Sequence, residues 1–223
     1  MKIDRAGIPF VVGAAAPGLV LSLLGLHAAG VLLLLLASCL ALFFRDPDRK
    51  LPAEIGRDAV LAPADGRVVH AGDPEAGVAP DGEWRQVSVF LSLLDVHVNR
   101  APIGGRVVAV AHRRGRFLPA FDRRSAGDNE RTEVRVDHDG QRVVFRQVVG
   151  VLARRVVCRL EPGMDVATGQ RVGIMKFGSR MDVFVPRSAS VEVSVGQTVR
   201  GGETIVARLA AESRPCADEG NGA

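Results

Sequence analysis

Two long stretches without a charged side chain open the sequence, at residues 8–26 and 28–44. Each is near the ~20 residues that a helix needs to cross the apolar core of a bilayer. Basic residues flank this pair of stretches on both sides and are absent between them. These flanking residues are Lys2, Arg5, Arg45, Arg49 and Lys50. We therefore expect a helical hairpin, with its turn in the cluster of Gly25, His27 and Gly30, that anchors the chain in the cell membrane with both of its ends on the cytoplasmic side.

This segment has four other interpretations. A cleaved signal peptide would have one shorter apolar core and a small-residue cleavage site, which Phe43-Phe44-Arg45 does not provide. A buried pair of soluble helices is disfavoured because the apolar residues cover every face. A single tilted span stays open because Pro17 and Gly18 interrupt the first stretch, and so does a hairpin that lies in one leaflet.

The rest of the chain has a different character. Most charged residues follow the apolar stretches, and the formal net charge is +4. A modest basic excess suits an anionic membrane surface, whereas no basic run interleaved with aromatic residues indicates nucleic-acid binding. The three cysteines, Cys39, Cys158 and Cys216, are too widely spaced to indicate a disulfide framework or a metal site.

From Leu51 onward, short β-branched runs alternate with Gly, Asp and Pro turn signals. Asp139-Gly140 lies between two such runs and predicts a tight hairpin. We expect a mainly β (α+β) domain of small curved sheets with hairpins like those of barrel-sandwich or lipoyl domains. The expected organisation is a membrane-anchoring hairpin at 1–50, a β domain at 51–210, and a disordered tail at 211–223, which has few groups to bury.

One segment carries chemistry. Gly178-Ser179 stands between two β-like runs, but such a pair alone is weak evidence because it is common in ordinary turns. Lys176 lies nearby, and a lysine at a hairpin tip is the attachment point of lipoyl and biotin carriers.

Six further segments appear in a fixed order and together are far more specific than any one of them. They are Phe43-Phe44-Arg45-Asp46-Pro47, Ala62 to Val68 with Asp65-Gly66, Phe90 to Pro102 with His97, Asn129-Glu130-Arg131, Gln147 to Arg155, and Phe177-Gly178-Ser179. In these segments the chain resembles the short form of the phosphatidylserine decarboxylase family. The resemblance covers nearly the whole chain apart from the tail.

The resemblance implies a self-processing enzyme. Ser179 would attack the carbonyl of Gly178, which a glycine leaves sterically open. The chain would be cut into a β chain, 1–178, and an α chain, 179–223, that stay together as a heterodimer, while any higher oligomer is left open. Ser179 would become a covalent pyruvoyl cofactor. This cofactor would serve the conversion of phosphatidylserine to phosphatidylethanolamine and CO2.

A serine hydroxyl needs a base within hydrogen-bond reach. We expect His97 to be that base and Asp65 to orient it, as in a Ser-His-Asp arrangement. Longer family members carry a second histidine three residues after the first, where this chain has Arg100. It therefore stays open whether His97 serves both cleavage and decarboxylation, or whether Arg100 binds the carboxylate or phosphate of the substrate.

Three alternative functions are kept. A membrane-tethered carrier or adaptor would use Lys176 but would leave Asp65, His97 and Ser179 without a purpose. A pyruvoyl decarboxylase of a soluble amino acid would not require the apolar hairpin. A serine hydrolase built on Ser179 ranks last because the Gly-x-Ser-x-Gly pattern is missing.

Overall fold

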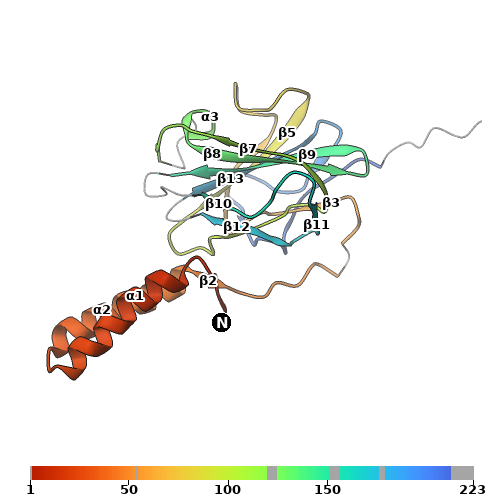
Figure 1. Cartoon of the computed structure of the whole chain (residues 1–223). Helices are drawn as coiled ribbons and strands as arrows, with labels where there is room; N and C mark the ends of the chain where they lie inside the picture. Colours follow the sequence, from red (N-terminus) through yellow and green to blue (C-terminus); the bar gives the residue numbers. More distant parts are fainter. Residues whose placement is uncertain (1, 54, 120–124, 151–155, 176–178, 212–223) are drawn as a thin grey trace, which may run out of the picture.

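A helical hairpin projects from one end of a β-sheet body in the computed structural model of the chain (Figure 1). The structure describes residues 2–53, 55–119, 125–150, 156–175 and 179–211.

The hairpin consists of α1 (Ile8–Leu23) and α2 (His27–Phe43). Gly25 makes the turn with a φ of 82°, a left-handed conformation that glycine adopts without strain. The Leu26 N–H donates to the Leu21 carbonyl at 2.9 Å, which closes the last turn of α1 as a Schellman motif. The expected helical hairpin with its turn at Gly25 is therefore confirmed.

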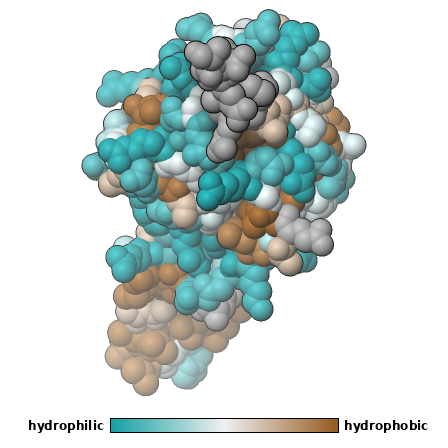
Figure 2. Space-filling view, turned by 90° about the vertical axis from the view of Figure 1, so that its right-hand side faces the viewer, coloured by the Kyte–Doolittle hydropathy of each residue, from teal (hydrophilic) through white to brown (hydrophobic). Residues whose placement is uncertain are grey.

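Small residues let the two helices approach closely. A Cβ atom on Gly30 would lie 2.0 Å from Ser22 Oγ, and one on Gly18 would lie 3.1 Å from Leu33. The outer faces of both helices are exposed and apolar, and Figure 2 shows the projecting hairpin as the most hydrophobic part of the visible surface. Within the described ranges, neither this pair nor any other helix combines the length and the hydropathy of a membrane span.

Antiparallel strands build the body, and the expected mainly β architecture is confirmed. The largest sheet has the order β11-β7-β8-β9-β13-β5-β4-β15, and three-stranded sheets have the orders β10-β12-β6 and β14-β16-β3. The strands of the large sheet are β11 (Asp165–Val166), β7 (Gly105–Arg113), β8 (Arg131–His138), β9 (Gln141–Val149), β13 (Ser179–Pro186), β5 (Trp84–Leu91), β4 (Gly66–Gly72) and β15 (Thr198–Val199). Those of the smaller sheets are β10 (Val156–Cys158), β12 (Arg171–Met175), β6 (Val98–Arg100), β14 (Ser190–Val191), β16 (Ile205–Arg208) and β3 (Ala59–Leu61).

Two short elements complete the described part: the pair β1 (Lys2–Ile3) with β2 (Arg45–Asp46), and the single-turn helix α3 (Ser125–Asp128). The predicted turn at Asp139-Gly140 joins β8 to β9, with φ values of 49° and 87°. Positive φ at both positions identifies a type I′ hairpin, which matches the twist of the flanking strands.

Alternation along β13 separates an apolar core from a buried polar layer. Met181 and Val183 face the main core, whereas Arg180 and Asp182 face the opposite side of the sheet. There the Arg180 guanidinium pairs with Asp182 and Glu75, so a strand buried on both faces keeps its charges compensated.

Phenylalanines join the hairpin to the body. Phe44 is completely buried and stacks on Phe10 of α1, with ring centroids 5.6 Å apart. Phe43 and Phe44 share a hydrophobic cluster with Val98 of β6 and Ile174 of β12. The base of the hairpin is thus packed directly against the small sheet that carries β6.

Residues 147–149, at the start of the segment Gln147 to Arg155, belong to β9, which pairs with β8 and β13. Residues 151–155 lie outside the described part, as does the expected tail apart from Ala211.

Candidate active site

Ser179 is the first residue of β13, where it pairs with Leu91 of β5 and Val149 of β9. It shares a strand face with Met181, so its side chain points toward the core. The residue is 0% exposed, and its Oγ is buried without a hydrogen-bond partner among the described residues. A buried hydroxyl with unused hydrogen-bonding capacity is costly, which makes it a candidate reactive group. Gly178 and Lys176, which the sequence singled out, lie outside the described residues.

His97 lies just before β6 and is also 0% exposed. Its Nδ1 is 2.9 Å from the Asp95 carbonyl oxygen, which can only accept, so Nδ1 carries the proton and Nε2 has a free lone pair. Nε2 is buried without a partner in the described part of the chain. Burial lowers the pKa of His97 from 6.5 to about 4, so the imidazole is neutral at neutral pH.

The residues around His97 fix the position of its ring. The Asp95 carboxylate accepts hydrogen bonds from the backbone N–H and the hydroxyl of Ser92, at 2.8 and 2.7 Å, and so holds the turn that leads to His97. Phe43, at the end of α2, packs against the imidazole with ring centroids 4.2 Å apart. The base of the apolar hairpin therefore forms one wall of the histidine site.

The topology places His97 and Ser179 at the same end of the body. The Met175 N–H at the end of β12 donates to the His97 carbonyl at 3.3 Å. Ser179 follows only four residues later, and four residues span at most about 14 Å. A serine hydroxyl and a neutral imidazole thus lie within the reach of one short chain segment.

Two further residues of this region were not among the predicted site residues. Asn99 of β6 and Gln147 of β9 are both 0% exposed, and Gln147 Nε2 donates to Asn99 Oδ1 at 2.8 Å. Asn99 Nδ2 and Gln147 Oε1 are buried without partners in the described ranges. The two-residue spacing of His97 and Asn99 is a period-2 signal that the sequence did contain, since it points both side chains to the same side of an extended chain.

The expected pairing of Asp65 with His97 is wrong. Asp65 Oδ2 accepts from the Arg49 guanidinium at 2.6 Å, and its Oδ1 accepts from the Gly201 N–H at 2.8 Å. Burial raises the pKa of the Asp65 carboxyl. The hydrogen bond from Gly201 and the charge of Arg49 lower this pKa, but the effect of burial is larger. The carboxylate is engaged by the segment that follows the hairpin, and the Asp95 carbonyl takes the orienting position at His97.

Arg100, the candidate for binding a substrate anion, is engaged by other groups in this structure. Its guanidinium donates to the carbonyl oxygens of Gly169 and Pro47, at 3.0 and 2.9 Å, and pairs with Asp46 at 3.4 Å. The side chain is nearly buried. These contacts hold the segment that follows the hairpin, at Asp46 and Pro47, against the β body. In this structure Arg100 therefore has a structural role.

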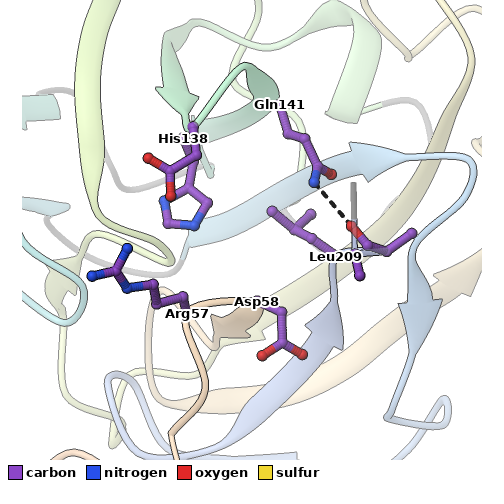
Figure 3. Close-up of a pocket in the computed structure, with 8 residues that line it drawn as sticks. Arg57, Asp58, His138, Gln141 and Leu209 are labelled. Carbon is purple, nitrogen blue, oxygen red and sulfur yellow. Dashed lines mark hydrogen bonds between the residues drawn. The ribbon is translucent and has the colours of Figure 1, made fainter. Parts of the chain in front are cut away.

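Of two pockets in the described part of the structure, one lies apart from Ser179 and His97 and the other lies beside the histidine site. Figure 3 shows one lined by Arg57, Asp58 and His138, in which Gln141 donates to the Ala210 carbonyl at 2.9 Å. Neither Ser179 nor His97 lines it. A second, apolar pocket of about 330 Å³ lies beside the phenylalanine that packs on His97, and its lining residues are Leu36, Cys39, Leu40, Leu42, Phe43, Arg45, Leu93 and Leu94.

Comparison with known proteins agrees with the geometry. The model of the phosphatidylserine decarboxylase family matches residues 36–207. A phosphatidylserine decarboxylase proenzyme of Solibacter usitatus is 44% identical over 209 residues, which cover 93% of this chain and 97% of the relative. Proenzymes of the same name from Anaplasma phagocytophilum and Paramagnetospirillum magneticum are 40% and 41% identical, over 95% and 93% of this chain and 92% and 87% of the relatives. The chain therefore belongs to the phosphatidylserine decarboxylase family.

Proposed function

We propose that this chain is a self-processing, membrane-bound decarboxylase that converts phosphatidylserine to phosphatidylethanolamine and CO2. Its family membership supports the reaction. The observation that carries the proposal for the site is that Ser179 Oγ and His97 Nε2 are both buried without a hydrogen-bond partner among the described residues. One is a nucleophile and the other is a base held in the required tautomer.

In the proposed self-cleavage, His97 Nε2 takes the proton of the Ser179 hydroxyl as Oγ adds to the carbonyl carbon of Gly178. The C–N bond then breaks, and the amide nitrogen of residue 179 takes up the proton. An ester links residues 178 and 179, and β-elimination releases a chain that ends at Gly178. The remaining group at 179 loses ammonia by hydrolysis and becomes a pyruvoyl group.

The residues present fit a pyruvoyl group at position 179. Asn99 Nδ2 is a buried donor that has no partner within the described ranges, which suits a carbonyl oxygen, and His97 Nε2 can accept and return a proton. When formed, the pyruvoyl group supplies an electron sink for the charge that loss of CO2 leaves behind. Burial of both residues excludes water from the reacting groups.

The two fragments would remain one body after the cut. The fragment 179–223 contributes β13, β15 and β16, which pair with β5, β9, β4 and β3 of the fragment 1–178. Met181 and Val183 of the small fragment lie in the core among residues of the large one. These ladders and this burial support a stable heterodimer.

The hairpin supports a lipid substrate. Its outward-facing leucines include Leu23 and Leu24, which are 87% and 70% exposed. We infer that these faces insert into the apolar phase of the cell membrane, with the body on the cytoplasmic side. The apolar pocket beside Phe43 suits an acyl chain of a phospholipid whose headgroup reaches His97. A carrier or a decarboxylase of a soluble amino acid would need neither feature.

The reaction is tested by CO2 release from phosphatidylserine in mixed micelles. We expect wild-type protein to be active and Ser179→Ala to be inactive, because alanine has no hydroxyl to form the cofactor. Ser190→Ala, at an exposed position of β14, is the matched control and should keep full activity. Activity in Ser179→Ala, or equal turnover of free serine and phosphatidylserine, would contradict the proposal.

Anchoring is tested by flotation with phospholipid vesicles. Replacing Leu23 and Leu24 with Glu places charges at the exposed tip of the hairpin, and we expect the variant to lose most of its vesicle binding. Val195→Glu makes the same kind of change at an exposed valine of the body and should still float. Flotation of the double leucine variant at the wild-type level would show that the hairpin tip is not inserted.

The proposed base predicts a pH profile for self-cleavage. His97 is neutral above its pKa of about 4, so the cleavage rate should stay level as pH falls through 6.5. Below about 4 the rate should fall tenfold per pH unit, because the protonated imidazole accepts no proton. The measurement follows uncut chain from cell-free synthesis on gels after transfer to buffers of different pH. A midpoint near 6.5 would contradict this prediction, because the acting base would then titrate like an exposed histidine and unlike the buried His97.

A further inference from the structure

The side-chain amides of Asn99 and Gln147 form a buried hydrogen-bonded pair. A contact of Gln147 with the backbone determines which way both amides point. Gln147 Nε2 donates to the Val157 carbonyl at 3.4 Å as well as to Asn99 Oδ1 at 2.8 Å. A carbonyl oxygen can only accept, so the nitrogen of Gln147 must face Val157. Asn99 then uses its oxygen toward Gln147 and presents both N–H groups of Nδ2 on its other side.

Gly173 of β12 makes this arrangement possible. A Cβ atom at this position would lie 2.0 Å from the Val157 carbonyl oxygen and 2.9 Å from Gln147 Nε2. Any larger residue would push the amide of Gln147 away from its two acceptors. The sequence thus keeps space for a hydrogen-bond chain that ends in Asn99 Nδ2, a donor with no partner in the part of the chain that the structure describes.

Strand register places this donor beside the reacting residue. Gln147 pairs with Met181 and Val149 pairs with Ser179, so Gln147 and Ser179 are diagonal neighbours on one face of the sheet, about 7 Å apart. Asn99 of β6 contacts this Gln147 through its side-chain oxygen, at 2.8 Å. His97 precedes Asn99 by two residues, a spacing that points both side chains to the same side of an extended chain.

We propose that Asn99 is a further catalytic residue, whose Nδ2 donates a hydrogen bond to the oxygen that becomes negative when Ser179 Oγ adds to the adjoining peptide carbonyl. This inference rests on the proposed function. The Oγ–C bond forms, the carbonyl π electrons move to oxygen, and the hydroxyl proton goes to His97. The electrons on this oxygen then re-form the carbonyl bond as the C–N bond breaks, and the amide nitrogen of residue 179 takes the proton from His97. Gln147 is a positioning residue that aims the Asn99 amide.

The test follows self-cleavage of newly made full-length chain over time. Asn99→Asp keeps the shape and the acceptor for Gln147 but has no N–H donor, and Asn99→Ala removes the whole amide. Loss of one such donor in a buried site typically slows a reaction by about 10²–10³. We expect both variants to cut at least about 10² more slowly than wild type. Gln86→Met, at a buried amide on the opposite face of the large sheet, is the matched control and should cut at the wild-type rate.

Further measurements separate this role from a structural one. Each substitution is also placed in a Ser179→Ala chain, which stays whole, and its thermal unfolding should show a folded protein. Hydroxylamine, which cuts esters, should not restore the rate of the Asn99 variants, because the slowed step precedes the ester. Gln147→Ala should slow cleavage less, and the double variant with Asn99→Ala should be no slower than Asn99→Ala alone.

The outcomes are distinct. Cleavage of folded Asn99→Asp and Asn99→Ala within about twofold of wild type would overturn this inference alone, since a donor to the oxyanion cannot be removed at so small a cost. Rescue of both by hydroxylamine would also overturn it, because the ester would then form normally. A wild-type chain that stays whole would overturn the proposed function and this inference with it.

Discussion

The pairing of β13 between β5 and β9 is the constraint on which the rest of the site depends. It opposes Ser179 to Leu91 on one side and to Val149 on the other, so the residue cannot turn away from the core. The same register places Gln147 diagonally beside it. A slip by one residue would exchange the two faces of β13 and would bring Arg180 into the apolar core in place of Met181. The apolar packing of the sheet therefore also fixes the position of the reacting hydroxyl.

Burial gives these polar groups their chemical character. An exposed histidine would be partly protonated near neutral pH, whereas desolvation keeps His97 neutral and its hydrogen bond to the Asp95 carbonyl leaves Nε2 as the acceptor. The hairpin contributes to this environment, because Phe43 covers the imidazole. The apolar segment is thus part of the active-site wall in addition to its proposed role in the membrane.

Local patterns in the sequence predicted the elements well and the side-chain partners poorly. The turn at Gly25, the hairpin at Asp139-Gly140 and the mainly β body followed from residue types and spacing. The partner of Asp65 did not, because Arg49 competes for the same carboxylate and a tertiary contact decides the outcome. The pair of Asn99 with Gln147 joins residues that are distant in sequence, so only the strand arrangement reveals it.

The central claim is that Ser179 is consumed to make the cofactor. Intact mass spectrometry of the purified wild-type protein, unfolded in acid, tests this most directly. The account predicts two species, residues 1–178 with an ordinary carboxyl end and residues 179–223 lighter than a serine-terminated fragment by the mass of one ammonia molecule. A single species with the mass of the whole chain, or a small fragment that retains its serine amine, would contradict it.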